Sequence, residues 1–132
     1  MDLLFSFKGR INRAKWWLGV LILFVVQMVL WFVLAAVFGL SSMGAMDSSD
    51  PAAMEAAMQQ MSTMMIPVGI LVLVMLYPAL AVYTKRWHDR NKSGWWSLII
   101  LIPIVGSIWF LVELGILRGT DGDNRYGPDP LA

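Results

Sequence analysis

The chain has 132 residues, of which 58% are hydrophobic and only 14% are charged, and its mean hydropathy is +0.66. A soluble domain is nearer half apolar and a quarter charged, and a core of this size cannot bury such an excess. The net charge of +1 indicates no general attraction to nucleic acid. Because there is no cysteine, disulfides, thiolate metal sites and thiol catalysis are excluded.

Three long apolar runs dominate the sequence, at residues 16–40, 64–83 and 95–117. Each is close to the roughly 20 residues that a membrane-spanning helix needs. Backbone groups in lipid must be satisfied within their own segment, which favours helices. We therefore predict an all-α integral membrane protein, with residues 1–132 forming one membrane domain built as a small bundle of three transmembrane helices. The connecting parts are then an outer loop, a hinge and a tail, at 41–63, 84–94 and 118–132.

The basic residues predict the orientation of the chain. Lys8, Arg10, Arg13 and Lys15 precede the first run, and four more basic residues lie in the hinge. The loop at 41–63 has only acidic charges. Since cytoplasmic loops carry the excess of lysine and arginine, we expect a multi-pass protein with a cytoplasmic N terminus and hinge. The same basic residues would lie against anionic lipid headgroups, which makes the bilayer an expected partner.

The third run carries an alternative interpretation. Pro103 and Gly106 lie in its middle. If the chain reverses there, neither half is long enough to span, and the segment becomes re-entrant with the tail on the cytoplasmic side. Charge asymmetry favours three full spans and an external C terminus.

The outer loop is rich in methionine. Asp50 followed by Pro51 is typical of a helix start, with an N-cap acceptor and then proline at the first helical position. Met58, Met61 and Met65 then share a helical face. We expect a short amphipathic helix on the outer surface, with methionine as adaptable apolar filler. A soft-metal site on these thioethers is the less favoured interpretation, and no metal or cofactor is expected.

The hinge combines charge with a turn. Arg86 and Asp89 are spaced i, i+3 on the end of the second helix. Residues 91–94 indicate a turn, after which Ser93 can cap a helix that Trp95 seats at the interface. His88 beside Asp89 suggests acid–base chemistry, but neighbours on a helix point about 100° apart and form no dyad by themselves.

Two polar residues interrupt the apolar runs. Gln27 lies mid-membrane in the first run, where an amide usually bonds a neighbouring helix. Glu113 lies near the end of the third run, close enough to the interface to reach water or Arg118.

Asn12 is placed to cap a helix that starts near Arg13. The turn-rich tail predicts either an ordered plug or a short solvated end.

Three motifs carry a family resemblance: FKGRINRAKWW at 7–17, KRWHDRNKSGWW with LIPIVG at 85–106, and GDNRYGPDP at 122–130. Together they resemble the bacterial inner-membrane family catalogued as domain of unknown function 805. The matching positions are Gly9, Arg10, Arg13, Trp17, Arg86, His88, Asp89, Ser93, Gly94, Trp95, Pro103, Gly106, Asn124, Arg125, Tyr126, Gly127, Pro128 and Pro130. Trp87 stands where such proteins typically carry leucine. The resemblance implies a small multi-helix protein of the bacterial inner membrane and implies no activity.

Three functions fit these observations. The favoured one is a non-enzymatic membrane protein that acts through helix packing with itself, as a homo-oligomer, or with a membrane partner. The second is an oligomeric channel or transporter component whose path Gln27, Glu113 and the broken third run would line. The third is an interfacial lipid-handling enzyme that would use Arg86, His88 and Asp89 on phosphate headgroups. The substrate and the oligomeric number do not follow from the sequence.

Overall fold

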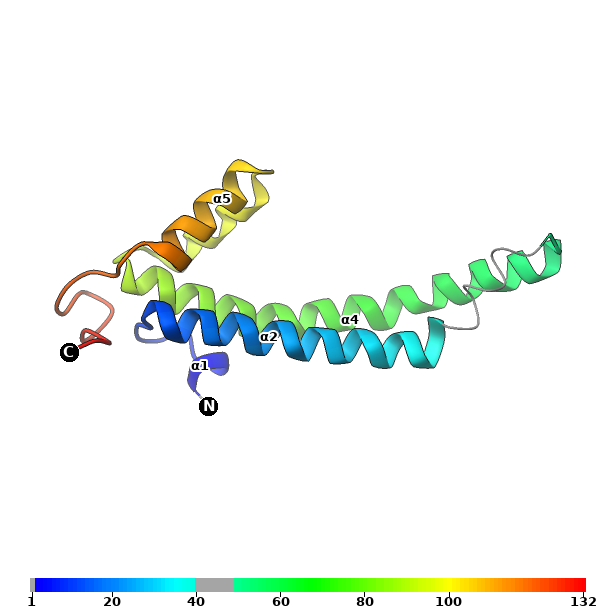
Figure 1. Cartoon of the computed structure of the whole chain (residues 1–132), viewed down its shortest axis with the longest axis horizontal. Coiled ribbons are helices and arrows are strands. Elements are labelled where there is room, and N and C mark those ends of the chain that lie inside the picture. The colour runs from blue at the N-terminus through cyan, green and yellow to red at the C-terminus, as the bar shows by residue number, and fades with distance from the viewer. Residues whose placement is uncertain (1, 40–48) are drawn as a thin grey trace. The chain divides into compact units, whose positions relative to one another are not determined.

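The computed structural model describes residues 2–39 and 49–132, and in these ranges the regular structure is helical with no strand (Figure 1). This confirms the predicted all-α class. The elements are α1 (Asp2–Phe5), α2 (Arg13–Leu34), the π-helix η1 (Ala35–Gly39), α4 (Pro51–Asp89), the 3₁₀-helix η2 (Gly94–Leu101), α5 (Val105–Leu111) and the π-helix η3 (Val112–Ile116). Residues 41–48 of the expected outer loop lie outside the described residues.

The chain divides into two compact units. The first comprises Met1–Leu23 with Leu76–Ala132, and the second comprises Phe24–Met75. The first unit holds the start of α2, the end of α4, the rest of the helices after it and the tail. The second holds the remainder of α2, η1 and the first part of α4.

Two predicted helix starts are confirmed. The Asn12 side chain accepts a hydrogen bond from the backbone N–H of Lys15 (2.9 Å), directly before α2. The Asp50 side chain accepts one from the N–H of Ala52 (3.1 Å), directly before α4.

In the described part of the outer loop, residues 49–63, the expected separate amphipathic helix is not confirmed. Instead, α4 continues for 39 residues from Pro51 to Asp89. Alanine, methionine, glutamate and glutamine, all good helix formers, fill its first turns, so nothing local ends the helix before the apolar run. Pro67 and Pro78 lie inside α4 without ending it, as prolines in membrane helices often do.

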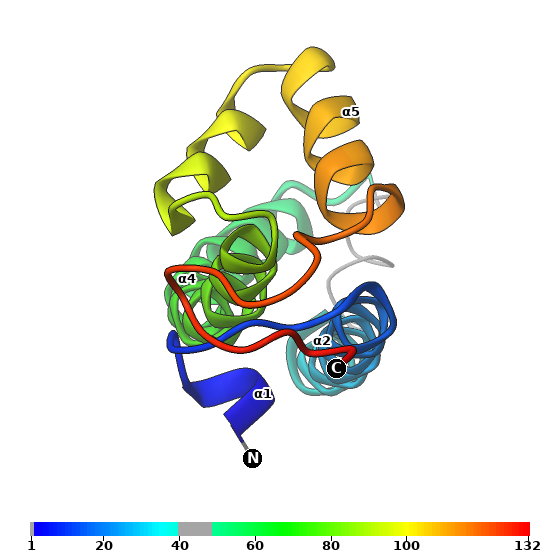
Figure 2. The ribbon, with the colours of Figure 1, turned by 90° about the vertical axis from the view of Figure 1, so that its left-hand side faces the viewer.

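Two helices are long and apolar enough to cross a membrane among the described residues, Arg13–Val37 and Pro51–Asp89. The third apolar run does not form one continuous helix, so three spanning helices are not confirmed. It forms η2, a turn and then α5 with η3, and the two halves lie side by side (Figure 2).

The reversal has a local cause. Pro103 supplies no N–H, and Ile104 adopts a left-handed φ of 63° that ends helical continuity. Gly106 lets the halves approach, because a Cβ there would lie 1.8 Å from the carbonyl oxygen of Ile99. The eight residues of η2 rise about 16 Å at the 3₁₀ spacing. The 7 and 5 residues of α5 and η3 rise about 18 Å at the α-helical spacing. Both lengths fall well short of a hydrocarbon core of about 30 Å.

The first unit has its own hydrophobic core, which seats the site described below. Its buried members are Ile11, Trp16, Val82, Trp87, Phe110 and Leu114. Gly19 lets α2 approach α4 closely, because a Cβ there would lie 3.0 Å from the side chain of Val82. We call the two halves of the third apolar run, η2 and α5 with η3, the hairpin. Apolar contacts thus hold the start of α2, the end of α4 and the hairpin together.

Candidate functional site

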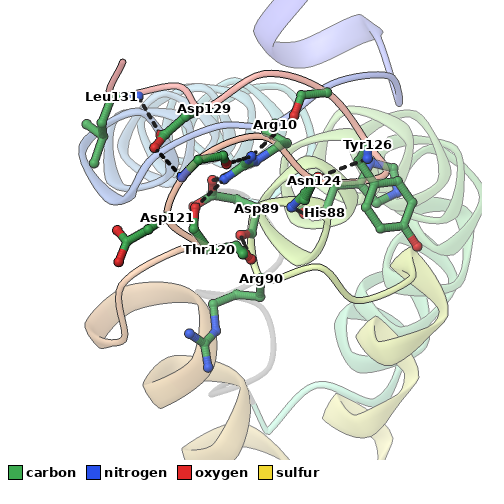
Figure 3. A network of polar contacts seen from close by, with 12 residues as sticks. Arg10, His88, Asp89, Arg90, Thr120, Asp121, Asn124, Tyr126, Asp129 and Leu131 are labelled. Carbon is green, nitrogen blue, oxygen red and sulfur yellow. Dashed lines mark hydrogen bonds and ion pairs between the residues drawn. The ribbon is translucent and has the colours of Figure 1, made fainter.

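A buried ion-pair network joins the N-terminal segment to the end of α4 (Figure 3). The Arg10 side chain is 1% exposed and that of Asp89 is 3% exposed. Arg10 Nε donates to Asp89 Oδ1 at 3.2 Å, and Arg10 Nη2 lies 3.1 Å from the same oxygen. The other carboxylate oxygen, Oδ2, pairs with Arg86. Both oxygens of Asp89 are therefore held by arginines: Arg10 lies 79 residues earlier in the chain, and Arg86 lies three residues earlier.

Arg10 also holds the C-terminal tail. Its Nη2 donates to the carbonyl of Thr120 at 2.6 Å, and its Nη1 donates to the carbonyls of Gly122 and Gly127 at 2.7 and 3.2 Å. The Thr120 N–H and hydroxyl in turn donate to the carbonyl of Asp89, at 2.8 and 3.0 Å. The tail is thus an ordered plug on the end of α4, as one of the two sequence-based alternatives proposes.

Arg86 connects the same carboxylate to the end of the hairpin. It is fully buried, and its Nε donates to the carbonyl of Leu114 at 2.7 Å. Its Nη2 donates to the carbonyl of Leu117, where η3 ends. These are among the carbonyls that a helix terminus leaves without partners, and Arg86 satisfies them.

His88 is a contact point for the tail. Its Nδ1 lies 3.2 Å from the carbonyl of Gly9, which makes Nδ1 the protonated nitrogen of the neutral ring. Tyr126 stacks on the imidazole with a centroid distance of 3.9 Å and an interplanar angle of 5°. The Asn124 amide donates to the His88 carbonyl at 2.9 Å. The Arg125 guanidinium lies over the Tyr126 ring, 4.8 Å from its centroid.

A tight turn presents these tail residues. The N–H groups of Asn124 and Gly127 each donate to the other's carbonyl, at 3.1 and 3.0 Å. Gly127 has a φ of 139° and Gly122 one of 71°, so both occupy the left-handed region that favours glycine. Hydrogen bonds from the N–H groups of Leu131 and Gly122 hold the pKa of the Asp129 carboxyl below its ordinary value.

Glu113 forms a second charged cluster at the base of the hairpin. Its two carboxylate oxygens accept from Lys92 Nζ at 2.7 Å and from Arg90 Nε at 3.0 Å. Burial by itself would raise the pKa of Glu113, but these two bonds outweigh it and bring the pKa below its ordinary value. The sequence suggested water or Arg118 as the partner of Glu113, whereas Arg118 pairs with Asp121 on the surface (3.1 Å).

The hinge turn follows the prediction. Asn91 takes a left-handed φ of 55°, and the Ser93 hydroxyl accepts from the N–H of Trp95 at 3.4 Å as η2 begins. Gly94 packs against the Thr84 side chain, from which a Cβ would lie only 2.6 Å away. Trp95 is 78% exposed, in keeping with a ring seated outside the core.

The remaining candidates lie in the second unit. Gln27 is half-buried in α2, and Met58, Met61 and Met65 are exposed on α4. Among the described residues, no group of three His, Cys, Asp or Glu side chains could hold a metal ion. The network described above lies in the first unit and joins motif residues to Thr120 and to carbonyls at the end of η3.

Several members of the network were missed by sequence reasoning. Thr120 and Arg90 carry no local signal, because their partners are fixed only by the fold. Arg13 was noted as a charge, but its bond to the Ile116 carbonyl (2.8 Å) depends on where the hairpin ends. Gly122 had a readable signal, since it lies between Asp121 and Asp123 in a turn-rich segment, whereas Gly127 was already among the matching motif positions.

Fold and site together define a helical protein whose long apolar helices fit a membrane, with its motif residues gathered where those helices end. The chain belongs to the family described as proteins of unknown function, DUF805, which it matches over residues 4–128. This confirms the resemblance seen in the three motifs.

Relatives in Escherichia coli (strain K12) fit the same class. The chain is 32% identical over 125 residues to inner membrane protein YhaH, covering 95% of this chain and 87% of that protein. It is 27% identical over 150 residues to the uncharacterized protein YiiR, covering 96% and 86%. It is 41% identical over 59 residues to inner membrane protein YhaI, covering 45% and 49%. No solved structure matches the chain. The names of YhaH and YhaI and the apolar helices of this chain fit a bacterial inner membrane.

Proposed function

We propose that this chain is a non-enzymatic protein of the bacterial inner membrane that acts through helix packing with a second copy or with a membrane partner. One observation carries the proposal: the buried charged residues of the family motifs are bonded to groups inside the chain. Arg10, Arg86 and Asp89 are buried and bonded to one another and to the tail or hairpin. What the first unit presents outward is instead the apolar hairpin of η2 and α5.

The geometry gives less support to an enzyme. A general base needs a free acceptor within reach of its substrate. Both oxygens of Asp89 are occupied by Arg10 and Arg86, so Asp89 has no free acceptor, and it does not orient the His88 ring, whose Nδ1 bonds the Gly9 carbonyl instead. A conducting path gains no support either, because Glu113 is paired with Arg90 and Lys92.

The architecture we propose has two spanning helices and a re-entrant hairpin. Arg10 bonds three carbonyls of the tail, so the N-terminal segment and the tail belong on one face of the membrane. The basic residues favour the cytoplasmic face. A C-terminal reporter active only in the cytoplasm should therefore give a signal, while one active only outside should stay silent. The opposite pair of results would rule out the re-entrant arrangement.

Packing can be tested with single cysteines, because the natural chain has none. Ile108 lies on α5 and is 60% exposed, while Leu131 lies in the tail and is 61% exposed. Oxidation in native membranes should produce a disulfide-linked dimer from Ile108→Cys and none from Leu131→Cys if copies pack through the hairpin. A photo-crosslinking residue at position 108 that captures one defined membrane protein would instead identify a partner. The packing role would be refuted if Ile108→Cys gave no disulfide-linked dimer and the photo-crosslinking residue at position 108 gave adducts with lipid alone.

A further inference from the structure

A small cavity lies where the start of α2, the end of α4 and the tail meet. Its volume is about 230 Å³, and the residues that matter to the argument are Asn12, Arg13, Arg86, Asp89, Arg118 and Gly119. Three guanidinium groups thus come from three separate segments to one hollow, which also contains one carboxylate.

In and around this cavity four arginines, Arg10, Arg13, Arg86 and Arg118, outnumber three carboxylates, Asp89, Asp121 and Asp129. Asp89, the carboxylate that lines the cavity, is shared between two arginines, Arg10 and Arg86, whose side chains are 1% and 0% exposed. That triad alone has one excess positive charge, to which Arg13 and Arg118 are added. The partner of Arg118 is Asp121, but their side chains are 67% and 76% exposed, and such pairs are weak and screened by salt.

The donors available to a ligand come from the rim. Arg86 uses its nitrogens on Asp89 and on the carbonyls of Leu114 and Leu117. Arg13 uses one terminal nitrogen on the Ile116 carbonyl, out of the five N–H donors of a guanidinium. Arg118 is mostly exposed and can turn toward the hollow. The positive end of the 22-residue helix α2 adds to the attraction for an anion.

The volume of the cavity and its level in the membrane limit the class of ligand that can bind. A volume of 230 Å³ lies below the roughly 300–1,000 Å³ of sites for drug-sized molecules, which excludes a whole nucleotide. Arg13 opens the first apolar helix, and Trp17, which is 48% exposed, follows it, as a ring at headgroup level does. Planar guanidinium forks match the oxygens of a phosphate group.

We propose that this cavity binds a phosphate group, supplied either by the headgroup of an anionic phospholipid or by free phosphate. Arg13 and Arg118 contact the phosphate oxygens, and the buried triad of Arg10, Arg86 and Asp89 supplies a fixed positive background. The phosphate site is a function in addition to the proposed helix packing. It is tested by ligand binding and the packing by crosslinking, so either proposal can fail while the other stands.

The test uses the full chain purified in detergent. Native mass spectrometry counts retained lipids after exchange into mixtures of phosphatidylglycerol and phosphatidylcholine, and tryptophan fluorescence follows titration of inorganic phosphate in phosphatidylcholine nanodiscs. The variants are Arg13→Gln and Arg118→Gln. Lys15→Gln is the matched control, because it removes the same charge from the same helix but lines a different hollow. Arg118→Gln keeps the test decisive if Arg13→Gln fails to fold, since Arg118 is mostly exposed.

The parent should retain phosphatidylglycerol in preference to phosphatidylcholine, or bind phosphate. Losing one charge-assisted contact should reduce that binding roughly tenfold in either arginine variant. Lys15→Gln should change it less than about twofold, as expected for a screened surface charge. Binding of phosphatidylglycerol alone identifies a lipid headgroup, whereas saturable binding of inorganic phosphate identifies free phosphate. Equal losses in Arg118→Gln and Lys15→Gln, or no binding by the parent, would overturn the proposal.

Discussion

Asp89 gives the most direct test of the role assigned to the buried network. Asp89→Asn keeps the size of the side chain but removes the only carboxylate that Arg10 and Arg86 share. Both arginine side chains are essentially inaccessible, at 1% and 0% exposure. The substitution therefore leaves two buried guanidinium groups without a counter-charge, and it turns one acceptor into a donor that faces them.

The size of the effect follows from burial. Removing one partner of a buried ion pair typically costs about 3–5 kcal/mol, because the other charge stays buried and uncompensated. We expect a loss of that order in the free energy of unfolding of the first unit. Asp121→Asn is the matched control, because its pair with Arg118 is largely exposed and such pairs contribute about 0–1 kcal/mol.

The measurement is equilibrium unfolding in mixed micelles of mild and denaturing detergent, followed by tryptophan fluorescence. Trp16 and Trp87 are 3% and 0% exposed in the core beside the network, so they report its opening. A loss below about 1 kcal/mol for Asp89→Asn, or one no larger than that of Asp121→Asn, would show that the network is not what holds this end of the molecule together.

Three further predictions concern the hairpin and the tail. Gly106→Ala should destabilise the hairpin in the same unfolding assay, because the added Cβ would lie 1.8 Å from a backbone carbonyl, whereas Gly69→Ala, with nothing within 4 Å, should be neutral or stabilising. The pKa of Glu113 is lowered on folding, so its contribution is present above its ordinary value of 4.5 and is lost as the pH falls below it; Glu113→Gln should flatten that part of the unfolding free energy against pH, and an unchanged slope would contradict the assignment. Asn124→Ala removes two side-chain hydrogen bonds of the tail turn, at about 1 kcal/mol each, and should speed amide hydrogen exchange in the tail while leaving exchange in α4 unaltered.

Features set by near neighbours in the chain were predictable. The Asn12 cap before α2, the Asp50 cap before α4 and the Ser93 cap before η2 each depend on residues no more than three apart. The Arg86–Asp89 pair depends on i, i+3 spacing along one helix. The family motifs and the apolar excess likewise sit in the chain itself, which is why the membrane class and the family could be predicted without coordinates.

The third apolar run shows where local information stops. The run is apolar and long enough for a membrane span, but Pro103 and Gly106 in its middle also permit a reversal. What decides between them is whether the two halves can pack, and that depends on the approach of Gly106 to Ile99 and on Arg86 holding the carbonyls at the far end.

The sequence by itself determined the helical membrane class, the helix ends and the charges that the motifs carry. Only the tertiary structure decided that the third run folds back and that Arg10 meets Asp89 and the tail. The reason is physical: helix formation and capping act over a few residues, whereas the Arg10 contacts join groups separated by 79 and by 110 or more residues. Such contacts exist only once packing has brought the N-terminal segment, the end of α4 and the tail to one place.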